Sequence, residues 1–303
     1  MTKIIKPPRY NQLSLFLLGL GFRIVNKIRH VIIGYKTPRP FSTKEIERSV
    51  SYCLRVVKNW EKALKVYEVN QNPFVGKHVV EIGPGPDLGT GIIILALGAR
   101  SYTAIDKNKL IDDMSQGFYN ALLDHLKELP EYIKAKKAVD NIQNKNFNEE
   151  FRYIWDTDFS LQKLPEKKFD ILVSQAVLEH LVNVSEVFKI LYYKLNSNAI
   201  MVNEVDLGAH TGLIRRLDPL NHLRYSDMIW NLLRFDGSPN RLRMSDYQKI
   251  FGGLGFKEIE TKQIMVLDKE YVKKSKPHLA ERFREYSDKD IETKSFYLLA
   301  TKQ

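Results

Sequence analysis

The stretch HVVEIGPGPDLGTGIIILALG, residues 78–98, combines a short apolar strand, a glycine turn and an apolar helix. Gly83 and Gly85 allow the backbone of the turn to pass close to a ligand, because glycine has no side chain to block the approach. The helix that follows presents free N–H groups at its N-terminus. Since turns of this kind also serve dinucleotides, the stretch predicts a ligand site without identifying the ligand.

Strands and helices alternate along most of the chain around this turn. The expected strands are residues 78–82, 101–105, 153–155, 169–174, 199–203, 257–264 and 295–301. Such alternation is typical of a parallel α/β sheet. The sequence therefore predicts an α/β fold with a Rossmann-like, mostly parallel sheet of seven strands.

The alternation is absent from two parts of the chain, and this indicates the domain organisation. Residues 1–72 show helical periodicity and are expected to form a basic, helical N-terminal extension. Residues 73–303 are expected to form the main domain. Within that domain, residues 206–245 interrupt the alternation after the fifth strand, so we expect an insertion that acts as a substrate lid.

Composition and charge exclude several classes of protein. The 303 residues are 44% hydrophobic and 27% charged, which are ordinary values for a globular protein. Of the 47 Lys and Arg, nine lie in residues 1–44 without any Asp or Glu, and the other 38 are nearly balanced by 36 acidic residues. This balance in the main body argues against nucleic acid as a partner. A single cysteine argues for a reducing, cytoplasmic setting, and no Cys and His spacing predicts a metal site.

Residues 11–36 form an unusual segment. An apolar run, LSLFLLGLGF at residues 13–22, is followed by RIVNKIRHVII, in which basic residues interrupt the apolar ones. The run is too short to span a bilayer, and no small-residue cleavage site of a signal peptide follows it. The segment is therefore expected to form a basic amphipathic helix that binds an anionic membrane surface peripherally, on the inner face of the membrane. The alternative is a helix that packs against the main domain.

Three acidic positions narrow the choice of ligand at the glycine turn. Glu81 stands two residues before the first glycine, where a dinucleotide-binding turn usually has an apolar residue, so a nicotinamide dehydrogenase is disfavoured. Asp106 closes the second strand, where a carboxylate can accept both hydroxyls of a ribose. After the third strand, Asp158 is favoured over Asp156 as the acceptor of an adenine amino proton, with Phe159 beside the ring. A ligand with an ammonium group, a ribose and an adenine but no phosphate fits this set, and S-adenosylmethionine is such a ligand.

At these residues the chain resembles the class I S-adenosylmethionine-dependent methyltransferases, from about residue 77 to 203. The stretch FDILVSQAVLEHL, residues 169–181, is similar to the fourth strand and following loop of that family. The resemblance implies that S-adenosylmethionine is the cofactor and that Gln175 lies near its methionine part. Asp87 stands where the family more often has a small residue. The expected cofactor contacts are Glu81, Gly83, Gly85, Asp87, Asp106, Asp158, Phe159 and Gln175.

The loop after the fourth strand narrows the reaction that the resemblance implies. Residues 174–177, SQAV, lack the Asn/Asp-Pro-Pro-aromatic pattern of enzymes that methylate exocyclic base amines. O-methylation with a protein base is the leading class, and C- or N-methylation stays open. His210 lies just past the fifth strand, at the edge that faces the ligand crevice, and an ordinary histidine pKa near 6.5 suits removal of a hydroxyl proton. His222 is the alternative base, whereas Glu179 and His180 are interpreted as a helix start and a packing element.

The expected lid is rich in arginine. Residues 206–245 contain six Arg and no Lys, and a planar guanidinium suits a carboxylate or a phosphate. We expect Arg241 and Arg243 to bind acid groups of the acceptor, with surface ion pairs as the alternative. The patterns HLRYSDMIW, residues 222–230, and PNRLRMSD, residues 239–246, resemble bacterial methyltransferases associated with surface-polysaccharide biosynthesis. That resemblance implies a glycan, a lipid-linked sugar or a related anionic metabolite as substrate.

Two other functions stay open from the sequence. The basic N-terminal extension is compatible with an RNA or protein methyltransferase that uses it to find its target. The fold is also compatible with a cofactor-binding scaffold that has no turnover.

Overall fold

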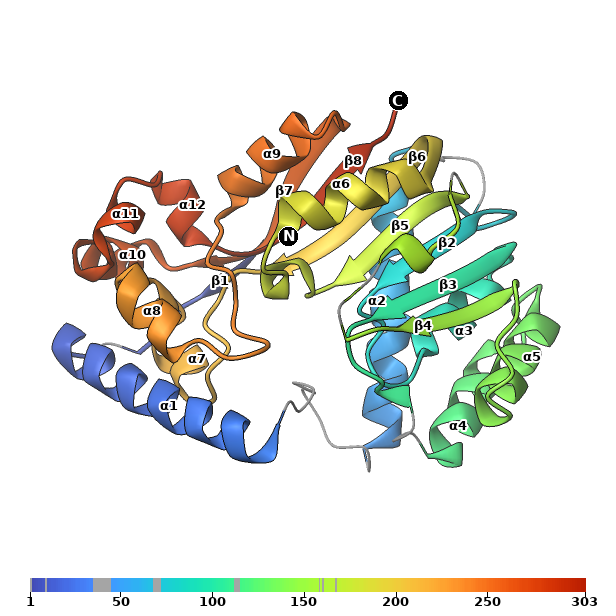
Figure 1. Cartoon of the computed structure of the whole chain (residues 1–303), viewed down its shortest axis with the longest axis horizontal. Helices are drawn as coiled ribbons and strands as arrows, with labels where there is room; N and C mark the ends of the chain where they lie inside the picture. The colour runs from blue at the N-terminus through green and yellow to red at the C-terminus, as the bar shows by residue number, and fades with distance from the viewer. Residues whose placement is uncertain are drawn as a thin grey trace.

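The computed structural model describes residues 2–8, 10–34, 45–67, 72–111, 115–157, 159, 161–166 and 168–303. Its centre is an eight-stranded sheet in the order β1-β7-β8-β6-β5-β2-β3-β4 (Figure 1). The strands are β1 (Lys3–Ile5), β2 (His78–Ile82), β3 (Ser101–Asp106), β4 (Phe151–Trp155), β5 (Phe169–Gln175), β6 (Leu195–Asp206), β7 (Lys257–Leu267) and β8 (Thr293–Thr301). β8 runs antiparallel to both of its neighbours, and the other pairs are parallel. The expected α/β fold with a mostly parallel sheet is therefore confirmed.

The strand count corrects the expectation of seven, because β1 adds an eighth strand at one edge of the sheet. β1 pairs in parallel with residues 265–267 of β7. Three residues are too few to show a hydrophobic period, so this strand forms only because the edge of β7 offers unpaired N–H and C=O groups. The other seven strands lie where the alternation predicted them.

Helices cover both faces of the sheet and enclose two hydrophobic cores (Figure 1). The helices of one face are α2 (Ile46–Leu64), α3 (Gly89–Ala96), α4 (Gln116–Leu126) and α5 (Tyr132–Gln143), and those of the other are α6 (Val184–Lys194) and α9 (Met244–Gly253). Successive residues of β2 point to opposite faces, so Val79 belongs to the first core and Val80 to the second. Burial on both faces explains why the strand sequences are almost continuously apolar.

Two glycines allow α3 to pack closely behind the glycine turn. A Cβ atom on Gly91 would lie 2.3 Å from the ring of Tyr102, and one on Gly89 would lie 2.9 Å from Sγ of Cys53. Any larger residue would force α3 away from β3 and α2. The N-terminus of α3 is therefore held at the end of β2, directly after the turn.

The residues expected to form one N-terminal extension lie in three different places. β1 joins the sheet, α2 packs on one of its faces, and α1 (Gln12–Ile33) lies against the segment of residues 206–245. That segment contains α7 (Ile214–Leu217), the 3-10 turn η4 (Asn221–Leu223) and α8 (Asp227–Leu233). In the part of the chain that the structure describes, no helix is both long and apolar enough to cross a membrane.

The remaining helical segments are short. They are the 3-10 turns η2 (Leu161–Lys163), η3 (Leu178–His180) and η5 (Lys276–His278) and the helices α10 (Lys269–Ser275), α11 (Glu281–Arg284) and α12 (Asp288–Glu292). α10, η5, α11 and α12 lie between β7 and β8 in sequence, and α10, α11 and α12 contribute to a small third core.

Candidate active site

A cavity of about 1720 Å³ opens at the carboxyl ends of the parallel strands. In the strand order, β3 and β4 lie to one side of β2, and β5 and β6 lie to the other. The chain reverses its direction of strand addition at this point, and open α/β sheets bind ligands at such a switch point. Because single-ligand sites usually measure about 300–1,000 Å³, the cavity has room for two ligands. The predicted cofactor residues that line it are Glu81, Gly83, Gly85, Asp87, Asp106, Phe159 and Gln175.

Both glycines of the turn have left-handed backbone angles, with φ of 65° at Gly83 and 74° at Gly85. A Cβ atom on Gly83 would lie 2.5 Å from Cγ2 of Val177, in the loop after β5, whereas one on Gly85 would meet nothing within 4 Å. Gly83 therefore permits close packing of the two loops. Gly85 leaves open space beside the backbone, as the sequence predicted for a ligand-binding turn.

The carboxyl group of Glu81 is turned into the protein and holds the turn in place. Its Oε2 accepts hydrogen bonds from the hydroxyls of Thr90 and Tyr102, both at 2.7 Å. Burial raises the pKa of Glu81 to about 7, although these two hydrogen bonds lower it in part. These contacts favour a role for Glu81 in orienting the turn over direct binding of a cation.

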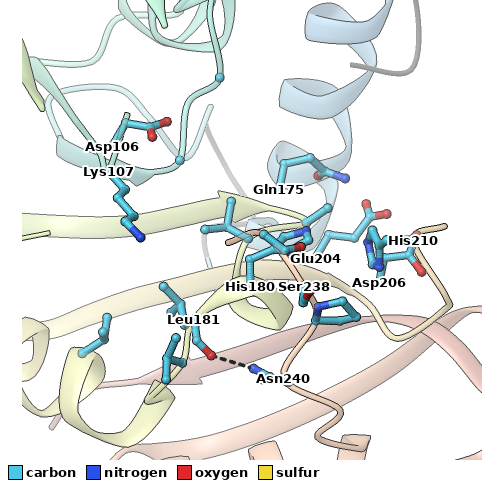
Figure 2. Close-up of a pocket in the computed structure, with 18 of the residues that line it drawn as sticks. Asp106, Lys107, Gln175, His180, Leu181, Glu204, Asp206, His210, Ser238 and Asn240 are labelled. Atoms are coloured by element: carbon cyan, nitrogen blue, oxygen red, sulfur yellow. Dashed lines mark hydrogen bonds between the residues drawn. The ribbon is translucent and has the colours of Figure 1, made fainter. Parts of the chain in front are cut away.

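Asp106 lies at the end of β3, on the opposite side of the cavity from Gln175 and His210 (Figure 2). Its Oδ1 accepts a hydrogen bond from the backbone N–H of Asn108 at 2.9 Å. Burial raises the pKa of Asp106 to about 6, and backbone hydrogen bonds oppose this shift. Asp106 is thus a carboxylate near pH 7 at the place where the sequence expected a ribose.

The other acidic predictions have different outcomes. Oδ1 of Asp87 accepts a hydrogen bond from the backbone N–H of Gly89, the first residue of α3, at 2.9 Å, and Asp87 also lines the cavity. Asp158 lies outside the described residues. Asp156 forms an ion pair with Lys163 at 2.7 Å and does not line the cavity. Phe159 does line the cavity.

Gln175 ends β5 and has a buried amide oxygen, Oε1, without a hydrogen-bond partner among the described residues. Its side chain donates to Glu204 of the neighbouring strand β6, which also accepts a hydrogen bond from Tyr297. Burial raises the pKa of Glu204 above its ordinary value. An orphaned buried acceptor in a cavity is costly, so Oε1 of Gln175 is a natural contact for a ligand's donor.

His180 and His210 meet in the cavity, with their ring centroids 4.8 Å apart in an edge-to-face arrangement. Nδ1 of His180 lies 2.7 Å from the carbonyl oxygen of Gly237 and must donate to it, which leaves the lone pair on Nε2. Nε2 of His210 lies 3.8 Å from Oε1 of Glu179. Nδ1 of His210 and Oε2 of Glu179 are buried without partners among the described residues.

The electrostatics of this cluster correct the expected acid strength of His210. Burial and the neighbouring His180 lower the pKa of His210 to about 3, against the ordinary value near 6.5 that the sequence suggested. Burial would raise the pKa of Asp206, but the positive charges of Lys294 and Arg215 oppose this, and the net shift is downward. His210 is therefore neutral at pH 7.

Glu179, His180 and His210 can also hold a metal ion, since each offers a ligand atom and these atoms all lie within 4.8 Å of one another. Two imidazoles and a carboxylate are a common ligand set for zinc or iron(II). The sequence interpretation missed this cluster, because it assigned Glu179 and His180 to packing. The sequence did contain a signal for it. Glu179 and His180 follow strand β5 and His210 follows strand β6, and the carboxyl ends of neighbouring parallel strands meet at one edge of the sheet.

The structure does not bring the alternative base, His222, or Arg243 to the cavity. His222 is buried near Trp230 and is absent from the residues that line the cavity. The fully buried guanidinium of Arg243 donates to the carbonyl oxygens of Asp290, Leu207 and Thr293. Arg243 therefore links separate chain segments inside the protein. The alternating spacing of Arg241 and Arg243 does not bring both side chains to the cavity.

Arg241 does line the cavity, but much of its guanidinium is already engaged. It donates to the carbonyl oxygen of Tyr225 and to Asp227, and it lies over the rings of Trp230 and Phe283. Burial lowers the pKa of Arg241 to about 10. The segment of residues 206–245 as a whole supplies one wall of the cavity, and its role as a lid stays a prediction.

No protein-family model and no curated protein matches the sequence. The CurJ carbon methyltransferase is 15% identical, with a TM-score of 0.47, over 96% of this chain and 67% of that one. Phosphoethanolamine N-methyltransferase 2 of Haemonchus contortus, in complex with S-adenosyl-L-methionine, is 12% identical, with a TM-score of 0.46. The match covers 89% of this chain and 60% of that one. A putative S-adenosylmethionine-dependent methyltransferase of Listeria monocytogenes is 15% identical, with a TM-score of 0.42. The match covers 76% of this chain and 92% of that one. The solved structures similar to this chain thus include S-adenosylmethionine-dependent methyltransferases.

Proposed function

We propose that the cavity binds S-adenosylmethionine and that the chain transfers its methyl group to a hydroxyl of a glycan, a lipid-linked sugar or a related anionic metabolite. The observation that carries this proposal is the buried amide oxygen of Gln175, which has no hydrogen-bond partner among the described residues, with the carboxylate of Asp106 across the same cavity (Figure 2). The first suits an ammonium group, and the second suits the two hydroxyls of a ribose. These two acceptors flank the turn at Gly83 and Gly85.

The remaining residues of the site fit the same ligand. Phe159 lines the cavity and offers an apolar ring to an adenine. A nicotinamide dinucleotide fits less well, because its pyrophosphate would lie at the N-terminus of α3, where the carboxyl group of Asp87 already accepts a hydrogen bond from the backbone N–H of Gly89. When bound, S-adenosylmethionine supplies an electrophilic methyl group on a sulfonium.

His210 is proposed as the base that takes the proton of the acceptor hydroxyl. Because burial keeps His210 neutral, one of its ring nitrogens carries a lone pair at pH 7. The nearby carboxylate of Asp206 raises the proton affinity of His210, and Glu179 lies 3.8 Å from its Nε2. The carboxylate of Asp206 would stabilise the imidazolium that forms, whereas burial raises the pKa of Glu179 well above its ordinary value. His180 supplies the second imidazole of this pair.

An anionic acceptor is supported by the basic side chains of the cavity wall. Arg234, Arg241 and Arg282 all line the cavity near α8. Since Arg241 already contacts Asp227 and Tyr225, and Arg282 pairs with the same Asp227 at 3.4 Å, we propose Arg234 as the main contact to acid groups of the acceptor. This replaces the pair Arg241 and Arg243 that the sequence suggested.

Calorimetry followed by methyl transfer tests the proposed function. Titration of the full chain with S-adenosylmethionine should give binding, and titration with NAD should give none; the reverse result would overturn the cofactor assignment. Tritium from labelled S-adenosylmethionine should then appear in glycan-containing extracts and not in RNA or protein. Label in RNA or protein would assign one of those acceptors instead, and binding without transfer to any extract would indicate a scaffold without turnover.

A further inference from the structure

One side of α1 is a continuous apolar surface that nothing in the described chain covers. Ile32 and Val31 are 76% and 75% exposed, and the other members are exposed by more than two fifths. The members of this surface, which we call the α1 face, are Leu13, Leu17, Leu18, Ile24, Val25, Ile28, Val31 and Ile32. Residues three, four or seven apart lie on the same side of a helix, and these eight follow such spacings. The α1 face therefore runs along the whole helix.

The opposite side of α1 is fixed to the body of the protein, so the helix cannot turn its apolar side inward. A Cβ atom on Gly19 would lie 2.2 Å from the side chain of Asn221, which donates to the carbonyl oxygen of Leu15 at 3.0 Å. Arg23 is buried and lies 3.6 Å over the ring of Trp230 in α8. One side of α1 therefore packs on the main domain, and the opposite side presents the apolar face. The two are not alternatives.

The α1 face continues onto the neighbouring short helices, which lie beside α1 (Figure 1). Lys27 of α1 donates to the carbonyl oxygen of Leu232 in α8. Met228 and Leu232 of α8 are 79% and 67% exposed, and Leu213 before α7 is also exposed. A shallow apolar groove lies between α1 and α8, where Ile24, Ile28, Val31 and Ile32 of the α1 face line it together with Leu233 of α8. Exposed apolar side chains therefore lie on α1, on α8 and just before α7, which are neighbouring elements.

Charge identifies the occupant of this surface. Residues 1–44 hold nine Lys and Arg and no acidic residue, and Arg29 on α1 and Arg216 on α7 are exposed. A second copy seated symmetrically on the α1 face would bring two basic helices together, at a cost in like-charge repulsion. An anionic bilayer satisfies both features, because its interface accepts the apolar side chains and its headgroups attract the basic ones.

We propose that the α1 face, together with Leu213, Met228 and Leu232, docks the protein peripherally on an anionic lipid bilayer. α8 joins this surface to the cavity, since its Asp227 and Trp230 line the cavity while Met228 and Leu232 are exposed. Docking would therefore place one wall of the cavity at the membrane interface. The proposal does not depend on methyl transfer, because it concerns binding alone.

Flotation of the full chain with lipid vesicles tests the proposal. The wild type should float with vesicles of equal parts phosphatidylcholine and phosphatidylglycerol, stay unbound with phosphatidylcholine alone, and bind less as salt is raised. Val25→Glu with Ile32→Glu should lower the bound fraction at least tenfold. The matched control, Val66→Glu with Ile133→Glu, changes two exposed residues outside the surface and should bind as the wild type does.

Other outcomes would overturn the proposal. They are a wild type that fails to float with anionic vesicles, a Val25→Glu/Ile32→Glu variant that floats as well as the wild type, or equal binding to neutral vesicles. A dimer in sedimentation that the Val25→Glu/Ile32→Glu change dissociates, without flotation of the wild type, would assign the surface to a second copy. Circular dichroism and melting of each variant exclude unfolding as the cause of lost binding.

Discussion

Burial changes the acid strength of Asp106, the carboxylate that we expect to hold the ribose. Replacing Asp106 with Ala should weaken binding of S-adenosylmethionine by roughly 1.5–3 kcal/mol, which is the scale for hydrogen bonds to a charged group. Calorimetry measures this change. Asp156→Ala is the matched control, because Asp156 follows the neighbouring strand but pairs with Lys163 and is absent from the cavity lining. Equal affinity of Asp106→Ala and the wild type would remove Asp106 from the site.

The raised pKa of Asp106, about 6, predicts a pH dependence of cofactor binding. A ribose needs the carboxylate form, so affinity for S-adenosylhomocysteine should be constant above that pKa and fall below it by up to about tenfold per pH unit. Glu81, with a pKa of about 7, also titrates in the cavity. Comparison with Asp106→Asn separates the two, because the loss below pH 6 should disappear in that variant while any contribution of Glu81 persists. A variant with the wild-type pH profile would contradict the assignment.

The neutral imidazole of His210 is expected to act on the acceptor and not on the cofactor. His210→Ala should lower kcat by about 100-fold, the lower end of the usual range for general-base catalysis, because a pKa of about 3 makes His210 a weak base, while the Kd of S-adenosylmethionine stays unchanged. Because its pKa is about 3, we expect no acid limb near pH 6.5 in the pH profile of kcat/KM. His222→Ala is the comparison, since His222 lies outside the cavity lining. A kcat of His210→Ala within a few-fold of wild type would move the role of base to His180.

At the scale of elements, Arg243 joins the start of α9 to the end of β6, to α12 and to β8. Its guanidinium donates to three carbonyl oxygens and is fully buried. Arg243→Gln should lower the free energy of unfolding by about 3 kcal/mol or more, because buried carbonyl groups would lose charged donors. Urea denaturation measures the loss, and exposed Arg216→Gln should change stability by less than about 0.5 kcal/mol. A stable Arg243→Gln variant with a raised KM for the acceptor would instead restore Arg243 as a substrate contact.

At the scale of the whole molecule, the cavity joins the sheet, the segment of residues 206–245 and α11. A ligand that contacts all of them stabilises only the folded state. S-adenosylmethionine at 100 times its Kd should therefore add about 2.7 kcal/mol of stability and raise the Tm of a chain of this length by about 4 °C. Thermal melting with S-adenosylmethionine and with NAD checks this expectation, and a shift with NAD alone would contradict the proposed cofactor.

The sequence by itself determined the parts of this protein that depend on neighbouring residues. Seven strands follow from local apolar runs and the helices between them, and the turn at Gly83 and Gly85 follows from glycine alone. Asp106 was predicted at the cavity because it closes a parallel strand, and the carboxyl ends of such strands meet at one edge. These inferences need no knowledge of distant contacts.

Only the tertiary structure decided which distant residues meet and which are buried. β1 exists through pairing with the edge of β7, and His180 meets His210 because β5 and β6 are neighbours in the sheet. Burial lowered the pKa of His210. It also directed the guanidinium of Arg243 to backbone carbonyl oxygens inside the protein. The physical reason is the same in each case: exposure and partners depend on how the elements pack, and residue spacing along the chain does not contain that information.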